Sequence, residues 1–139
     1  MNINSAVFSW HGIKFNSAIR LLKKSEDIIS AYVYGSVVSE HFRPDSDIDI
    51  ALLLKPGARM NSIQKLQLAA ELSSLLKRET HIGIISNEHL IFTKEVIENG
   101  QRLFTKNEYF DSLCNATAIS MYIQLRENNK EVIDAYATR

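Results

Sequence analysis

The chain has 139 residues, 45% of them hydrophobic, which suffices for one globular domain with an ordinary core and leaves no room for a second. Its 16 basic and 16 acidic residues cancel, so it lacks the positive potential of proteins that hold long nucleic acids by their phosphates. We therefore expect no direct binding of long nucleic acid, and we expect any bound phosphate to belong to a small ligand.

The location expected from the sequence is the cytoplasm. Cys114 is the single cysteine, so no internal disulfide can form, and the first residues lack the basic-then-apolar pattern of a secretion signal. The longest apolar run, Ile48 to Leu54, is interrupted by Asp49 and is far too short to cross a bilayer. A membrane role is not expected.

The first half of the chain predicts one helix and two strands. Residues 1–13 show no clear period and are left as an unassigned arm. A helix is predicted from about Lys14 to the charged stretch at 23–27, because apolar residues recur there at helical spacing. Residues 28–34 are rich in β-branched and aromatic side chains and stop at a glycine, which favours a strand, and residues 46–54 form a second strand.

The second half predicts a helix over 61–77, opened by Asn61 and Gln64, and a short strand over 80–85. A further helix ends at Asn99-Gly100, and residues 103–104 add an edge strand. Residues 106–137, which contain neither proline nor glycine, form one long or slightly broken C-terminal helix. The predicted fold class is α+β: a small mixed sheet with helices packed on one face and a long C-terminal helix.

Gly35 and Ser36 stand where the first long strand ends. A glycine at that point tolerates positive φ and allows the main chain to approach a phosphate, and the serine adds a hydroxyl donor. The pair is interpreted as part of a cradle for a nucleoside triphosphate.

Asp47 and Asp49 lie on the second long strand, separated by Ile48. Because side chains alternate along a strand, the two carboxylates share one face while the isoleucines take the core face. Two neighbouring carboxylates repel each other unless a divalent cation lies between them, and Mg²⁺ prefers such oxygen ligands. Metal ions bridging a transferred phosphoryl group stabilise both the attacking and the leaving oxygen, so nucleotidyl transfer is the predicted reaction class.

This segment, Gly35-Ser36 through Asp47-Ile48-Asp49, resembles the signature of the DNA polymerase β-like nucleotidyltransferases. The small size and the tail Thr117–Tyr122 are also similar to the minimal nucleotidyltransferase (MNT) antitoxins that pair with HEPN ribonuclease toxins. The resemblance implies one minimal nucleotidyltransferase domain over 1–139, with Mg²⁺ as cofactor and ATP as substrate. It also implies a cognate HEPN-family toxin as partner, neutralised by binding and by transfer of AMP to a toxin tyrosine.

The family pattern breaks at the next core strand, where polymerase β-like enzymes carry a third carboxylate. Alternation along Glu79–Ile84 turns Glu79, His81 and Gly83 toward the open side, and the alignment places His81 at the carboxylate position. A neutral imidazole is a poor Mg²⁺ ligand, so His81 could weaken a second metal site, act as a base toward the incoming hydroxyl, or be a surface residue without a role. Glu79 could supply the missing carboxylate.

The candidate site therefore has catalytic residues Asp47, Asp49 and His81, metal ligands Asp47 and Asp49, and nucleotide-binding residues Gly35, Ser36, Arg43 and Ser46. Arg43 is included because a guanidinium pairs well with phosphate, and for Ser46 a structural role in the turn is favoured. Three functions remain open: an antitoxin that adenylylates its toxin, a catalytically weak or silent antitoxin that acts by binding alone, and a small-molecule adenylyltransferase.

Overall fold

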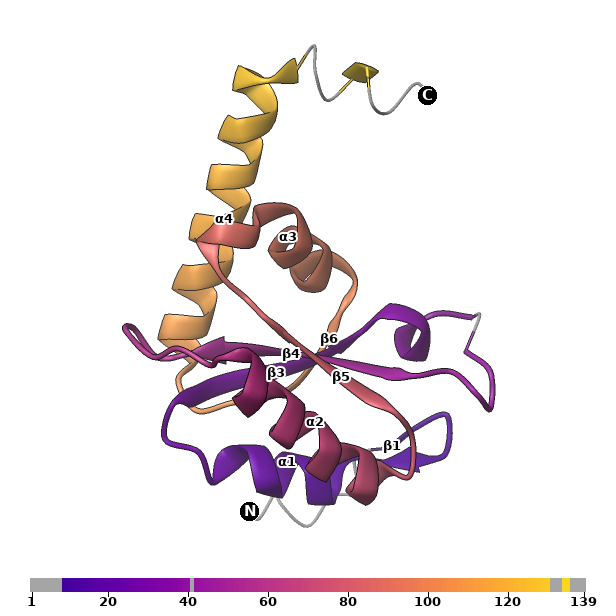
Figure 1. Ribbon diagram of the computed structural model, residues 1–139. Coiled ribbons are helices and arrows are strands. Elements are labelled where there is room, and N and C mark those ends of the chain that lie inside the picture. The colour runs from indigo at the N-terminus through magenta and orange to yellow at the C-terminus, as the bar shows by residue number, and fades with distance from the viewer. Residues whose placement is uncertain (1–8, 41, 131–133, 136–139) are drawn as a thin grey trace.

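The fold is a four-stranded mixed sheet with helices on both sides (Figure 1). The structure is a computed structural model that describes residues 9–40, 42–130 and 134–135. The elements in chain order are β1 (Ser9–Trp10), β2 (Ile13–Lys14), α1 (Asn16–Lys23), β3 (Ile28–Tyr34), the 3₁₀ helix η2 (Gly35–Val38), β4 (Ile48–Leu54), α2 (Ser62–Leu76), β5 (Thr80–Ile84), the 3₁₀ helix η3 (Asn87–His89), α3 (Leu90–Asn99), β6 (Gln101–Thr105) and α4 (Glu108–Asn128).

The sheet has the strand order β5-β4-β3-β6. The strand β3 pairs antiparallel with both β4 and β6, whereas β4 and β5 run parallel, so the sheet is mixed and β6 is an edge strand as the sequence predicts. The parallel register places His81 of β5 directly beside Asp49 of β4. The predicted α+β fold class is confirmed, and the central strands match their predicted limits closely because their β-branched runs have clear ends.

The sheet buries both of its faces, which corrects one detail of the prediction. One face carries residues such as Ile50 and Val33 and packs against α1 and α2. The opposite face carries Tyr32, Ala51 and Leu53 and is covered by apolar side chains of α3 and α4. Helices on one face only were expected, but this second row of apolar side chains also has to leave water, and α3 and α4 cover it.

The helix α2 has a complete capping box at its start. The Asn61 side chain accepts from the Gln64 N–H at 2.8 Å, and the Gln64 side chain accepts from the Asn61 N–H at the same distance. Such a cap stabilises a helix by about 1 kcal/mol and fixes where it begins. At the other end, Lys77 adopts a left-handed conformation with φ 57° and turns the chain into β5.

The helix α4 is fixed to the sheet by a buried polar cluster. The Tyr32 hydroxyl lies 2.8 Å from Asp111 Oδ1, and Arg102 of β6 donates to Asp111 Oδ2 at 3.2 Å. Asp111 is 1% exposed, so this pairing is what makes a carboxylate tolerable there. Burial raises the pKa of Tyr32 to about 12. Farther along, α4 extends beyond the body of the domain (Figure 1), and residues 123–130 are exposed.

The predicted C-terminal helix over 106–137 is present as α4 from Glu108 to Asn128, and after a turn at Asn129 the described residues 130 and 134–135 are again helical. The sequence places the apolar residues Val132, Ile133 and Tyr136 near the end of this predicted helix, but residues 131–133 and 136–139 lie outside the described residues. The arm that the sequence left unassigned contains the two-stranded hairpin β1–β2 ahead of α1. None of the described helices is both long enough and apolar enough to cross a membrane.

Candidate functional site

The site is built at one end of the sheet, where β3 turns into η2. Gly35 has φ +77°, a conformation that side chains rarely adopt. A Cβ atom on this residue would lie only 2.5 Å from Asp49 Oδ2, so the glycine also lets the main chain contact the carboxylate. Ser36 follows in η2, where its carbonyl accepts from the Ser39 N–H and hydroxyl at 3.0 Å. The predicted Gly-Ser turn therefore lies directly against the second aspartate.

Asp49 lies between β3 and β5, opposite Tyr34 on one side and His81 on the other. Burial raises the pKa of its carboxyl, the neighbouring Asp47 raises it further, and His81 acts in the opposite direction. Burial and Asp49 likewise raise the pKa of Tyr34 to about 12. A half-buried carboxylate held beside a second one is stabilised by a cation, which is the electrostatic property expected of a metal site.

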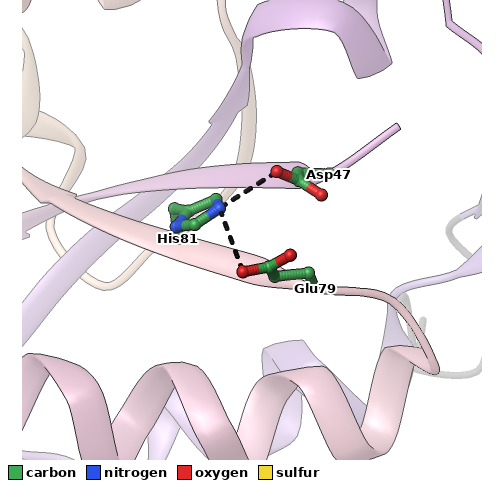
Figure 2. Close-up of side chains that lie close together, drawn as sticks. All are labelled: Asp47, Glu79 and His81. Carbon is green, nitrogen blue, oxygen red and sulfur yellow. Dashed lines mark hydrogen bonds and ion pairs between the residues drawn. The ribbon is translucent and has the colours of Figure 1, made fainter. Parts of the chain in front are cut away.

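Asp47, Glu79 and His81 form a cluster at the entrance to this site (Figure 2). His81 Nε2 lies 3.1 Å from Asp47 Oδ2 and 3.8 Å from Glu79 Oε1. One potential ligand atom from each of the three residues lies within 4.8 Å of the others. The side chains of Asp47 and His81 are about half exposed, at 46% and 52%, so substrates can reach them.

The turn before Asp47 is held by Arg78, which lies two residues before β5 begins. Its Nη1 donates to the carbonyl oxygens of Arg43, Pro44 and Ser46, at 3.3, 2.6 and 3.2 Å. The same guanidinium lies 4.8 Å above the ring of Phe42. Arg78 therefore fixes the loop that delivers Asp47 to the site.

Arg43 and Ser46 take part in this turn through different groups. The Ser46 hydroxyl accepts from the Arg43 N–H at 2.9 Å, and the Ser46 N–H donates back to the Arg43 carbonyl at 3.0 Å. Arg43 hydrogen-bonds to other described residues through its main chain and not through its side chain, which is exposed. The expectation of a structural role for Ser46 agrees with this geometry, and a phosphate contact by Arg43 stays a prediction.

The structure thus brings together Gly35, Asp47, Asp49 and His81, the residues central to the sequence prediction. The sequence reading missed Arg78, because nothing in a single arginine before a strand indicates which distant carbonyls it will meet. It also gave no role to Tyr34, although the residue immediately before Gly35 on an alternating strand has to share a face with Asp49 once the strands are paired.

The donor set fits a hard divalent cation. Asp47, Asp49 and Glu79 offer carboxylate oxygens, which Mg²⁺ prefers, and because burial raises the pKa of Asp49, a bound cation would favour the charged form of this carboxyl. His81 is the exception in this set, since nitrogen is a weaker ligand for Mg²⁺ than oxygen.

Comparisons with known proteins agree with this geometry. The family model described as "Polymerase beta, Nucleotidyltransferase" matches residues 16–109, whereas none of the curated proteins matches the chain. A toxin–antitoxin crystal structure with AMP-PNP is 26% identical, with a TM-score of 0.77 over 88% of this chain and 97% of that chain.

Two further solved complexes are similar to the chain. One is a mutant MntA–HpeT toxin–antitoxin structure, 25% identical with a TM-score of 0.75 over 88% of this chain and 97% of that chain. The other contains the tri-AMPylated Shewanella oneidensis HEPN toxin and its MNT antitoxin, 25% identical with a TM-score of 0.72 over 88% and 94% of the two chains. Since the family match covers more than half of the chain and every residue of the site from Gly35 to His81, this chain belongs to the polymerase β nucleotidyltransferase family.

Proposed function

We propose that the chain is an antitoxin-type minimal nucleotidyltransferase that transfers AMP from ATP to a HEPN-family toxin. The proposed acceptor is the hydroxyl group of a toxin tyrosine. The observation that carries the proposal is the contact between Gly35 and Asp49 beside the Asp47–His81 pair, in a chain that is similar along 88% of its length to toxin–antitoxin structures. One of those structures contains AMP-PNP and another an AMPylated toxin.

The reaction requires one bond to form and one to break. The acceptor oxygen bonds to the α-phosphorus of ATP, the bond from that phosphorus to the oxygen bridging to the β-phosphate breaks, and pyrophosphate leaves. The hydroxyl proton has to be taken up by a base or by water. His81 is suitably exposed for this: with its Nε2–H donating to Asp47 Oδ2 at 3.1 Å, the ring is held in place and Nδ1 is the nitrogen left to take the proton.

Asp47 and Asp49 are the proposed Mg²⁺ ligands, with Glu79 as an additional carboxylate. When bound, Mg²⁺ would neutralise charge on the triphosphate and on the developing oxygens of the reaction. Gly35 and Ser36 are proposed to receive the triphosphate, because the glycine leaves the main chain uncovered next to Asp49. The cytoplasmic location stays a prediction that goes with this function.

The proposal is tested by incubating the protein with labelled ATP, Mg²⁺ and a HEPN-family protein that forms a complex with it. Label on the partner, lost when Mg²⁺ is chelated and recovered on a tyrosine-containing peptide, is the expected result. An unlabelled partner, in a mixture where complex formation is verified by gel filtration, would reject the enzymatic function.

A second candidate is a silent antitoxin that neutralises its partner by binding alone. It is favoured by His81, which stands beside Asp49 where the family resemblance leads one to expect a carboxylate. The variant His81→Asp separates the two: faster Mg²⁺-dependent transfer would mean that a missing oxygen ligand limits the rate. A loss of transfer on the same change would mean that the histidine already serves as base or positions the acceptor.

A further inference from the structure

A hollow of about 380 Å³ lies between α2 and β5. The helix contributes one face to it, on which side chains follow each other at helical spacing and most are small: Lys65, Leu66, Ala69, Ala70 and Ser73. Leu66 is 72% exposed despite its apolar side chain. We call this hollow the α2–β5 groove.

The floor of the groove is a sheet edge. The carbonyl of Glu79 accepts from Ile48 and the amide of Ile85 donates to Leu52, so these alternate residues of the β5 segment bond to β4. In a parallel pair the residues between them point their main-chain N–H and C=O groups away from the neighbouring strand. Thr80 is an example, because its N–H donates to the Ser73 hydroxyl of α2 at 3.0 Å. Ile82 therefore directs its N–H and C=O away from β4, where no described strand pairs with it.

The α2–β5 groove shares two residues with the candidate site. Glu79 and His81 are among its lining residues, and the side chains of the same two residues form the cluster with Asp47 (Figure 2). A chain lying along Ile82 would pass within reach of His81 without entering the turn at Gly35 and Ser36, which the proposed function assigns to the triphosphate.

We propose that the α2–β5 groove receives an extended segment of the protein that accepts AMP, which pairs with the free edge of β5 as an added strand and presents its hydroxyl side chain at His81. This inference rests on the proposed function and adds the acceptor subsite to it. The small side chains of Ala69 and Ala70 leave room for a backbone, and Leu66 offers an apolar contact for a neighbouring side chain of the segment.

A peptide suits this groove better than the nucleotide does. Unpaired N–H and C=O groups alternate along a strand edge and match another peptide chain, whereas a triphosphate needs donors and positive charge. Lys65 is the one lysine or arginine among the residues that line the groove. The Glu79 carboxylate also lines it and would repel a phosphate.

The test fills the groove without touching the cluster. Ala70→Trp places a large ring in it, and Gln67→Trp places the same ring on an exposed part of α2 outside the lining. With the same HEPN-family protein as acceptor, Ala70→Trp is expected to lower kcat/KM for transfer about tenfold or more. The control variant should match the unaltered protein, and both should bind ATP with unchanged affinity.

Two results would overturn the inference: wild-type transfer by Ala70→Trp, or a parallel loss of ATP affinity, which would assign the groove to the nucleotide. Amide exchange gives a readout that does not need activity. In the complex of the unaltered protein with the HEPN-family protein and AMP-PNP, exchange of the Ile82 N–H should slow about tenfold or more relative to the free protein. Transfer by the unaltered protein with unchanged Ile82 exchange rejects the groove alone, whereas absence of transfer with a protected Ile82 rejects the proposed chemistry and keeps the groove.

Discussion

A methyl group at position 35 would collide with the carboxylate that the site depends on. Gly35→Ala is expected to cost about 1–2 kcal/mol of stability for the positive φ alone, and to displace Asp49 as well, because the added Cβ would lie 2.5 Å from its Oδ2. AMP transfer should fall on the order of a hundredfold. Gly57→Ala is the matched control, with φ +83° and no atom within 4 Å of the added Cβ.

Urea unfolding should show a loss of stability for Gly57→Ala and at least as large a loss for Gly35→Ala, while transfer falls only for Gly35→Ala. Equal transfer by both would mean that the position of Asp49 against the glycine has no part in the reaction.

The Asp49 carboxylate is predicted to lower the stability of the metal-free protein although AMP transfer requires it. Burial and the neighbouring Asp47 raise the pKa of its carboxyl, which means that its charged form is disfavoured in the folded protein without metal. Asp49→Asn should therefore raise the melting temperature in a chelating buffer while lowering Mg²⁺-dependent transfer by at least about a hundredfold. A lower melting temperature for this variant would show that the carboxylate is structural.

At the scale of elements, Arg78 links the start of β5 to the loop before β4. Its guanidinium donates to three loop carbonyls, which a lysine ammonium reproduces only in part and a methionine not at all. We expect Arg78→Met to lower kcat about tenfold, with partial rescue by Arg78→Lys, because the loop positions Asp47. Arg20→Met, an exposed site on α1, serves as control, and an unchanged kcat in Arg78→Met would leave the loop without this role.

The elements most faithful to the sequence prediction are those with strong local signals. The strand at 28–34 is reproduced residue for residue, and Asn61 and Gln64 form the predicted capping box. The hairpin at 9–14 escaped prediction because strands of two residues are too short to show a period. The helices that cover each face of the sheet were harder to predict, since the sequence shows that Leu53 is apolar but not which later helix will cover it.

The candidate site also combines features that local sequence patterns predict with contacts that they do not. The Asp47–Asp49 spacing and the glycine ending a strand are local patterns, and the alternation of β5 already turned His81 toward the aspartates. The hydrogen bond from Arg78 to Pro44, by contrast, joins residues 34 positions apart and depends on the parallel pairing of two strands. Contacts of this kind are properties of the folded chain, and no window of sequence contains them.

At the scale of the whole molecule, α4 combines a fixed half and a projecting half. Asp111 ties its start to Tyr32 and Arg102, whereas the part beyond Tyr122 is exposed, with Ile123 at 53%. An apolar side chain on a projecting helix suits a partner surface, so we expect this half to bind the toxin.

Truncation after Tyr122 should therefore leave a folded domain that still binds ATP but has lost most of its affinity for the HEPN-family partner. Circular dichroism, ATP titration and co-purification measure the three properties. Full partner affinity in the truncated protein would move the interface to the surface around Asp47 and the α2–β5 groove.

The central place of β3 in the sheet has a consequence for how the protein is made. Its partner on one side, β4, follows soon after it in the chain, but its partner on the other side, β6, consists of residues 101–105. Until the ribosome has released that segment, β3 is an uncovered edge of a growing sheet, rich in apolar side chains and able to pair with another nascent chain. The period of greatest risk for aggregation thus closes only when β6 docks and Asp111 reaches Tyr32.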